Sequence, residues 1–207
     1  MAARNPRGGF RLVVDAGRLA WFGKVGDFLP FIRVVNDASS TTDHSMNAIR
    51  DIATSDFDAV IALNDAEVQQ TSPMDAARLR LLFDMAAYRK VGRVDGEVAA
   101  FLIALRDGAP YQNDNYDWFA SRFPRFIYVD RIVVGARFAG RGIGRMLYED
   151  LFAFARTSGV QTITCEYNID PPNPASRAFH DRFGFRELGR QRVADGTKLV
   201  SLQAAEI

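Results

Sequence analysis

The stretch RIVVGARFAGRGIGRMLYEDLFAFA, residues 131–155, decides how the rest of the sequence is interpreted. It runs from an apolar segment through three alternate glycines, Gly140, Gly142 and Gly144, into a pattern typical of a helix. Glycine lacks a Cβ atom, so main-chain N–H groups can approach a bulky ligand closely there. A helix that begins at this point has unpaired N–H donors and a positive dipole end. The stretch therefore predicts a site for an anion, most often a phosphate group.

Two common phosphate-binding motifs do not fit this stretch. A P-loop needs Gly-Lys-Ser/Thr, whereas Gly140 is followed by Arg-Gly, so the lysine and the hydroxyl group are both missing. A dinucleotide-binding G-x-G-x-x-G motif needs a third glycine where Arg145 or Leu147 stands. Glu166 keeps the dinucleotide alternative open, because such folds place a ribose-binding acid near the end of the following strand.

A third motif, R/Q-x-x-G-x-G/A, is matched by residues 137–142, which follow a predicted strand and open a predicted helix. Downstream, NPASRAFHDRFGF (residues 173–185) has an asparagine, a small residue three positions on, an aromatic residue six positions on, and then Gly-Phe. With these two motifs in this order, the sequence resembles the GNAT superfamily of acetyl-CoA-dependent N-acetyltransferases. The resemblance covers about residues 46–207 and includes the order of the predicted elements.

From residue 46 onward, the hydrophobic pattern predicts the order β-α-α-β-β-β-α-β-α-β-β. Asp-Gly at 95–96 and at 195–196 predicts two hairpin turns. The polar and aromatic segment 107–123 predicts a loop with one helical turn. The expected fold class is α/β (α+β mixed sheet): a GNAT-like central mixed β-sheet, largely antiparallel with a parallel crossover at the phosphate-binding loop, flanked by helices.

The composition indicates a globular protein. The chain has 207 residues, of which 48% are hydrophobic and 25% charged, so a sizeable core can form. The net charge of +1 gives no reason to expect a nucleic-acid or membrane partner, and no apolar run approaches the roughly 18 residues of a membrane-spanning helix. One cysteine excludes an intrachain disulfide and favours a reducing compartment, so we expect a cytoplasmic protein. A homodimer is compatible with the sequence, which does not fix the oligomeric state.

The first 45 residues differ in pattern from the rest. Their apolar pieces are interrupted by charges, glycine or proline, and a polar tract, NDASSTTDHS, precedes Met46. We expect residues 1–45 to be an N-terminal extension that is poorly ordered or lies upstream of the natural start at Met46, and residues 46–207 to form the GNAT-like domain. A first helix or hairpin that covers one face of the sheet is the alternative.

The resemblance implies acetyl-CoA, or coenzyme A, as the cosubstrate. The strand before the glycines would pair through its backbone with the peptide-like arm of coenzyme A, the loop amides would surround the pyrophosphate, and arginines would add charge-assisted contacts. A tight strand-to-helix connection with solvated arginines is the alternative, although it requires fewer glycines. Two histidines and one cysteine make no metal-spaced cluster, so we expect no metal. The expected cofactor-binding residues are Ile132, Val133, Val134, Arg137, Phe138, Ala139, Gly140, Arg141, Gly142, Ile143, Gly144, Arg145, Asn173, Ser176 and Phe179.

Acetyl transfer to an amine needs an acceptor for the amine proton, stabilisation of the carbonyl oxygen and a proton for the leaving thiolate. His180 stands where many family members have a tyrosine that protonates the sulfur, so it is the candidate acid; a surface histidine is the alternative. Glu166 and Asp130 are candidates to relay the amine proton, with structural hydrogen bonding as the alternative for each. The resemblance implies that the N–H group of Val133 or Val134 meets the carbonyl oxygen.

The acceptor side is predicted from aromatic and acidic residues. Rings and carboxylates in YQNDNYDWF, residues 111–119, suit an ammonium-bearing substrate, whereas a surface loop anchored by its aromatic residues is the alternative. Cys165 alternates with Ile163 and Tyr167 along a strand, which is typical of a packed residue rather than an acyl-carrying nucleophile. The expected substrate-binding residues are Tyr116, Trp118, Tyr128 and Asn168.

The resemblance to the GNAT superfamily implies an enzyme that transfers an acetyl group from acetyl-CoA to a primary amine, and we expect direct attack in a ternary complex. The amine belongs to a small molecule, or to a protein or peptide. The alternative is a non-catalytic sensor or interaction module that binds acetyl-CoA, because His180 in place of tyrosine leaves room for it. A nicotinamide-nucleotide enzyme is disfavoured by the missing third glycine.

Overall fold

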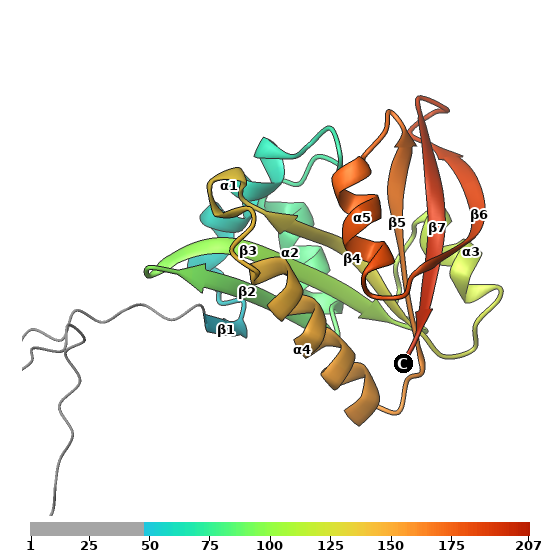
Figure 1. The fold of residues 1–207 in the computed structure, drawn as a ribbon, viewed down its shortest axis with the longest axis horizontal. Coiled ribbons are helices and arrows are strands. Elements are labelled where there is room, and N and C mark those ends of the chain that lie inside the picture. The colour runs from blue at the N-terminus through green and yellow to red at the C-terminus, as the bar shows by residue number, and fades with distance from the viewer. Residues whose placement is uncertain (1–47) are drawn as a thin grey trace, which may run out of the picture. The chain divides into compact units, whose positions relative to one another are not determined.

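A seven-stranded mixed sheet forms the centre of the protein, and helices cover both of its faces (Figure 1). The computed structural model describes residues 48–207, so the extension predicted for residues 1–45 lies outside the described residues. The strand order is β1-β2-β3-β4-β5-β7-β6, and every neighbouring pair is antiparallel except β4 and β5. The predicted mixed, largely antiparallel sheet is therefore confirmed. The strands are β1 (Ala48–Asp51), β2 (Tyr88–Val94), β3 (Glu97–Arg106), β4 (Ile127–Val134), β5 (Thr162–Asp170), β6 (Arg186–Val193) and β7 (Lys198–Glu206).

Helices on the two faces cover two separate apolar clusters. One cluster is packed under α4 and α5, and the other under α1, α2 and α3. Leu147 and Leu151 of α4 are four residues apart, so they share one helix face, and both are fully buried against the sheet. Within residues 48–207, each helix is too short or too polar to span a bilayer. The helices are η1 (Thr54–Asp56), α1 (Phe57–Ala66), α2 (Ala76–Met85), α3 (Asp114–Ala120), η2 (Ala136–Phe138), α4 (Ile143–Thr157) and α5 (Pro174–Asp181).

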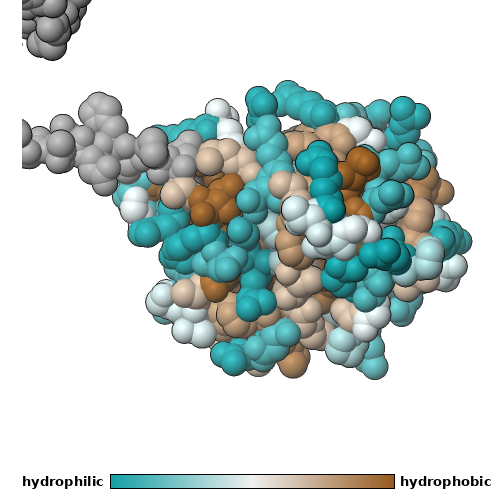
Figure 2. All heavy atoms as spheres, turned by 90° about the horizontal axis from the view of Figure 1, so that it is seen from below, coloured by the Kyte–Doolittle hydropathy of each residue, from teal (hydrophilic) through white to brown (hydrophobic). Residues whose placement is uncertain are grey.

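Polar and apolar residues are mixed on the surface. On the face drawn in Figure 2, hydrophobic residues are interspersed with hydrophilic ones. Leu81 and Leu188 are the large hydrophobic side chains that stay exposed in the described part of the chain. Isolated exposed leucines are normal on soluble proteins, so they indicate no interface by themselves.

Both Asp-Gly pairs form the predicted turns. Asp95 and Gly96 have φ angles of 51° and 80°, as a two-residue hairpin between β2 and β3 requires. The turn between β6 and β7 holds Ala194, Asp195 and Gly196 in the same left-handed region. These turns could be predicted because their backbone geometry depends on residues that are adjacent in sequence.

Segment 107–123 is more regular than predicted, because it contains the seven-residue helix α3. The Asn113 side chain accepts hydrogen bonds from the N–H groups of Asn115 and Tyr116, at 2.9 and 3.1 Å, and so caps the helix. Tyr116 and Phe119 bury their rings against the sheet and hold the short helix in place. Packing, rather than helix length, therefore stabilises α3.

The sheet is nearly interrupted between β4 and β5. The two strands are paired only at Ile127 with Ile163 and at Tyr128 with Thr164, close to the N-terminal ends of both. Past these pairs the strands run apart, as Figure 1 shows, up to Val134 and Asp170. The facing backbone edges of β4 and β5 are therefore unpaired along most of their length.

A β-bulge lies in β4 where the strands separate. Arg131 is opposite Ile103 of β3 and Val129 is opposite Ala104, so Asp130 is the extra residue. Neighbouring side chains on a regular strand point to opposite faces, whereas the bulge lets Asp130 and Arg131 form an ion pair of 2.6 Å.

Candidate active site

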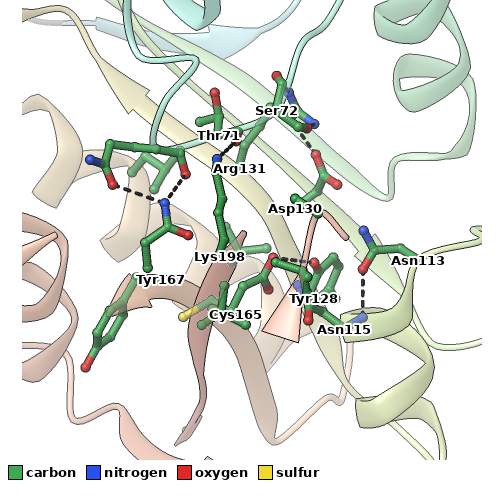
Figure 3. Close-up of a pocket in the computed structure, with 18 of the residues that line it drawn as sticks. Thr71, Ser72, Asn113, Asn115, Tyr128, Asp130, Arg131, Cys165, Tyr167 and Lys198 are labelled. Carbon is green, nitrogen blue, oxygen red and sulfur yellow. Dashed lines mark hydrogen bonds and ion pairs between the residues drawn. The ribbon is translucent and has the colours of Figure 1, made fainter. Parts of the chain in front are cut away.

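A cleft of about 640 Å³ opens where β4 and β5 separate. Its walls are residues of both strands, the α1–α2 loop, the segment before α3, the N-terminal half of α5 and the β6–β7 hairpin (Figure 3). A concave site at a break in a sheet, with several converging polar groups, is typical of a small-molecule site. The polar residues used below are Arg78, Tyr111, Tyr128, Asp130, Arg131, Glu166, Asn168, Asn173, Ser176, His180 and Lys198.

The glycine loop forms an open cradle of amides after β4. Gly140 and Gly142 have φ angles of 78° and 80°, a conformation that favours glycine. A Cβ atom built on either residue would meet nothing within 4 Å, so the space above this backbone is free. Several N–H groups here have no hydrogen-bond acceptor among residues 48–207. They belong to Gly140, Gly142, Ile143, Gly144 and Arg145.

Gly144 differs from Gly140 and Gly142 because the space next to its Cα atom is occupied by neighbouring side chains. A Cβ atom at this position would lie 3.3 Å from Val134 Cγ2 and 3.4 Å from Phe179 Cε2. Its missing side chain therefore lets α4 approach both β4 and α5 closely. Phe179 also packs edge-on against Tyr148 of α4, with ring centroids 4.8 Å apart.

The three arginines around the cradle are held by surface acids. Arg145 Nε lies 2.7 Å from Glu149, Arg141 lies 3.6 Å from Asp95, and Arg137 forms an ion pair with Glu97. All six side chains are more than half exposed, and exposed ion pairs contribute little to stability. The guanidinium groups can therefore exchange these partners for a phosphate at low cost. Phe138 and Ala139 lie between Arg137 and Gly140, with Phe138 buried and Ala139 exposed.

The free edge of β4 offers main-chain donors to the cleft. Gly135 N–H donates to Ala99 O of β3, at 2.9 Å. Because N–H groups along a strand point alternately to its two edges, that of Val133 faces β3, while those of Ile132 and Val134 face away from it. Of the two predicted donors for the carbonyl oxygen, Val134 thus lies on the open edge.

Glu166 places a carboxyl group in the cleft with a strongly perturbed pKa. Tyr128, which is fully buried, donates its hydroxyl hydrogen to Glu166 Oε1 at 2.8 Å. Glu166 Oε2 is shielded from solvent and accepts no hydrogen bond within normal distance and angle limits from the described residues. Burial raises the pKa of Glu166 to about 8, partly offset by the hydrogen bond from Tyr128. A carboxyl group with this pKa can take up and release a proton near neutral pH.

Asp130 is committed to an ion pair. Its Oδ2 accepts from Arg131 Nε, its Oδ1 accepts from the Tyr111 hydroxyl, and its side chain is only 3% exposed. Arg131 in turn donates to Asn64 Oδ1 at 2.8 Å and contacts Ser72 of the α1–α2 loop. With both oxygens engaged and its charge balanced, Asp130 is a weaker candidate proton acceptor than Glu166.

His180 is buried on α5 and has both ring nitrogens engaged. Nδ1 lies 2.8 Å from Ser176 O, which can only accept, so Nδ1 carries the proton. Nε2 then accepts from the hydroxyl group of Tyr148, at 2.7 Å. Burial lowers the pKa of His180, so the ring is mainly neutral at neutral pH. Asn173 caps this helix by accepting from Ser176 N, at 3.0 Å, as its sequence position predicts.

The four predicted acceptor residues separate into two pairs. Tyr128 and Asn168 line the cleft, whereas Tyr116 and Trp118 do not. Tyr116 is buried and donates its hydroxyl hydrogen to Arg106 O at 2.6 Å, and Trp118 lies against the backbone of Gly189 in β6. These two rings anchor the loop to the core, which is the alternative that the sequence left open.

Asn168 and a residue that the sequence analysis missed hold the α1–α2 loop. Asn168 Nδ2 contacts Gln70 O at 3.3 Å, and Lys198 Nζ donates to Gln69 O and Thr71 O at 2.7 and 2.9 Å. Arg78 was missed in the same way, because it lies on α2, far in sequence from either motif. A lone basic residue on a helix or strand gives no sequence signal for a site.

Cys165 lies in the apolar cluster under α4 and α5. Its side chain is almost fully buried, and burial raises the pKa of the thiol well above its usual value. A thiol in this state is a poor nucleophile, which agrees with its predicted role as a packed residue.

Comparison with known proteins agrees with this geometry. The model of the acetyltransferase (GNAT) family matches residues 46–185, more than half of the chain. No curated protein matches the chain closely enough to count as a relative. Solved structures with a similar fold include the ribosomal-protein-S18-alanine N-acetyltransferase of Escherichia coli, with 21% identity over 78% of this chain and 94% of that one and a TM-score of 0.58. Ard1 from Thermoplasma volcanium is 16% identical over 78% and 97%, with a TM-score of 0.65. The putative acetyltransferase yncA of Salmonella typhimurium, solved with acetyl-CoA, is 18% identical over 78% and 94%, with a TM-score of 0.60.

Proposed function

The chain belongs to the GNAT family of acetyltransferases, and from this membership we propose that it transfers the acetyl group of acetyl-CoA to a primary amine by direct attack in a ternary complex. The observation that carries the proposal is the position of Glu166. Its carboxyl group, with a pKa of about 8, stands in the cleft between the diverging strands. β4, on the opposite wall, leads directly into the open amide cradle.

The residues present fit coenzyme A. Acetyl-CoA supplies an activated acyl group as a thioester. The free amides of the cradle, at the N-terminus of α4, would hold its diphosphate, and the nearby arginines would add charge-assisted contacts. The open edge of β4 would hydrogen bond its peptide-like arm, and the N–H group of Val134 would then be available to the carbonyl oxygen.

Glu166 would accept the proton of the attacking amine. An alkylamine has a pKa of about 10 and arrives mostly protonated, so it must lose a proton before it can attack. The ionised Glu166 carboxylate takes this proton, while the Tyr128 hydroxyl holds the carboxylate in place. The amine nitrogen would then form its bond to the acetyl carbon as the bond from carbon to sulfur breaks, and the departing thiolate would take up the second proton that the nitrogen loses.

For His180 we propose a positioning role in place of the acid role that the resemblance implies. In the neutral ring, the single N–H is used by Ser176 O and the other nitrogen accepts from Tyr148. The ring could donate only after it had gained a second proton, which its lowered pKa disfavours. His180 therefore fixes α5 against α4, next to Asn173 and Ser176 at the cleft.

Two measurements test the proposal. Calorimetry with acetyl-CoA tests the cradle, and release of the coenzyme A thiol during a screen of primary amines, followed by mass analysis of the product, tests transfer. Glu166→Gln should lower kcat/KM by at least about 100-fold, as expected for loss of a general base, with acetyl-CoA affinity unchanged. Glu206→Gln, an exposed glutamate on β7, is the matched control and should have no effect.

The outcomes separate the alternatives. Tight binding of acetyl-CoA without turnover on any amine would favour the non-catalytic sensor or interaction module. Absence of acetyl-CoA binding would refute both that alternative and the enzyme.

A further inference from the structure

The acceptor end of the cleft contains more positive than negative charge. Arg78 of α2 and Lys198 of β7 both line the cleft and are half-buried. Neither forms an ion pair with a carboxylate of residues 48–207. Half-buried cations without a nearby anion are unusual, because partial loss of hydration is not compensated.

Tyr111 holds the guanidinium group of Arg78 in place, and most of the N–H donors of this group remain available. Its Nη2 donates to the Tyr111 hydroxyl at 3.0 Å, and its guanidinium carbon lies 5.2 Å from the centre of the Tyr111 ring. Tyr111 passes its own hydroxyl hydrogen to Asp130, which is already paired with Arg131. Arg78 is therefore linked to the Asp130 carboxylate only through the Tyr111 hydroxyl group, and the charge of this carboxylate is already balanced by Arg131. Of the five N–H donors of Arg78, one is used by the described residues.

No other acid in the cleft balances this charge at neutral pH. Glu166, with a pKa of about 8, is mostly protonated at pH 7. Asp114 lies at the exposed start of α3, where solvent screens its charge. Lys198 donates two of its three hydrogens to backbone carbonyls, as Figure 3 shows for Thr71, and these carbonyls carry no net charge.

From this arrangement we infer that the acceptor is an amino acid or a related primary amine that carries a carboxylate, and that Arg78 binds this carboxylate. The inference rests on the proposed acetyl transfer, because it names the substrate class for the same cleft. The Tyr111 and Tyr128 rings lie side by side with centroids 6.2 Å apart. Arg78 stands at the Tyr111 end of this wall and Glu166 at the Tyr128 end. The substrate carboxylate and amine would occupy these two ends, so Arg78 would be a specificity-determining residue.

The test uses acceptors that differ only by a carboxylate. Each α-amino acid with a neutral side chain is compared with its decarboxylated amine, and ω-amino acids of increasing chain length are compared with alkylamines of the same length. The wild-type protein should prefer the carboxylated member by at least about tenfold in kcat/KM, as expected for a partly buried charge-assisted hydrogen-bonded pair. The length of the ω-amino acid that shows the largest preference over its alkylamine indicates the distance between Glu166 and Arg78.

Arg78→Gln should collapse this preference to less than about threefold, mainly by raising KM for the carboxylated member. Arg78→Lys, which keeps the charge but not the fork of donors, should retain part of it. Arg80→Gln is the matched control: Arg80 lies on the same helix, is exposed and pairs with Asp84, so this variant should keep the full preference. A wild-type ratio near one, or a ratio that Arg78→Gln leaves unchanged, would overturn the inference.

A binding experiment separates this inference from the proposed function. Protein loaded with coenzyme A is titrated with N-acetylated amino acids and with the corresponding N-acetylated alkylamines. If these amino acid products bind better, and Arg78→Gln abolishes the difference, the anion subsite stands even where no amine is acetylated. If amines are acetylated with no carboxylate preference, the acetyl transfer stands and the subsite is refuted.

Discussion

Replacing Glu166 with glutamine should remove one ionisation from the pH dependence of acetyl transfer. The Glu166 carboxyl group has a pKa of about 8, raised mainly by burial. At pH 7 about one molecule in ten would carry the ionised base, and at pH 9 about nine in ten would do so. Turnover that depends on this carboxylate should therefore gain about tenfold in kcat/KM between pH 7 and pH 9 from this group alone.

The assay must remove the ionisation of the acceptor itself, because an alkylamine with a pKa of about 10 also loses its proton over this range. That contribution is the same for both proteins when the same amine is used, so it cancels in the ratio of wild-type to Glu166→Gln kcat/KM. Thiol release at subsaturating amine, from pH 6.5 to 9.5, gives this ratio. We expect it to rise about tenfold from pH 7 to pH 9 and then level off. A flat ratio would refute Glu166 as the base, even if the variant were slower.

Two further measurements check the cause of the shifted pKa. Tyr128→Phe removes a hydrogen bond that lowers the pKa of Glu166, so the inflection should move to higher pH. Folding raises the pKa of Glu166 from 4.5 to about 8. Between these two pH values, the carboxyl group is therefore mostly protonated in the folded protein and mostly ionised in the unfolded chain. Stability is therefore greatest below pH 4.5 with respect to this group and is lost as the pH rises through 8. Urea unfolding at pH 5 and pH 8 should show this loss in the wild type and not in Glu166→Gln.

Gly142→Val should weaken acetyl-CoA binding at least about tenfold in calorimetry, because the new side chain occupies the open space above the cradle. Gly196→Val, at a φ of 83° in the β6–β7 turn, introduces the same backbone strain elsewhere and should leave this affinity unchanged. Gly92→Ala would place a Cβ atom 2.3 Å from Ile143 Cγ2 and should lower the free energy of unfolding by about 1–3 kcal/mol. Combined with Ile143→Ala, it should destabilise by less than the sum of the single changes, and simple additivity in urea unfolding would contradict the clash. His180→Ala should lower the thermal midpoint, since a buried hydroxyl loses its partner, and leave the inflection near pH 8 in place. Loss of that inflection would reinstate the histidine as an acid.

The sequence predicted the features that depend on neighbouring residues. The glycine cradle, the Asp-Gly turns and the Asn173 cap all follow from backbone conformations that particular residue types favour, and each is present in the structure. The separation of β4 and β5 was not predicted; the family resemblance implied only that the strand before the glycines pairs through its backbone with coenzyme A. Local chemistry could not show where these two strands would separate.

Features that depend on distant packing were missed. The ion pair between Asp130 and Arg131 exists because β3 imposes a bulge on β4, and adjacent strand residues would otherwise face apart. Tyr116 has the right chemistry for a ligand site, but its ring is buried and its hydroxyl is satisfied by a backbone carbonyl. Arg78 reaches the cleft only because α2 packs against the sheet. Sequence spacing carries no information about these contacts.

The acyl-donor side and the amine-acceptor side of the cleft differ in the number of chain segments that build them. The amide cradle comes from one continuous stretch, from the end of β4 into α4, whereas the acceptor wall is assembled from the α1–α2 loop, the first turn of α2, the segment before α3 and the β6–β7 hairpin. Surface loops tolerate insertions and replacements far better than a strand-to-helix junction does. Descendants of this chain could therefore exchange one amine for another through changes in these loops and at Arg78, while the strand-to-helix junction that would bind the acyl donor stays unchanged.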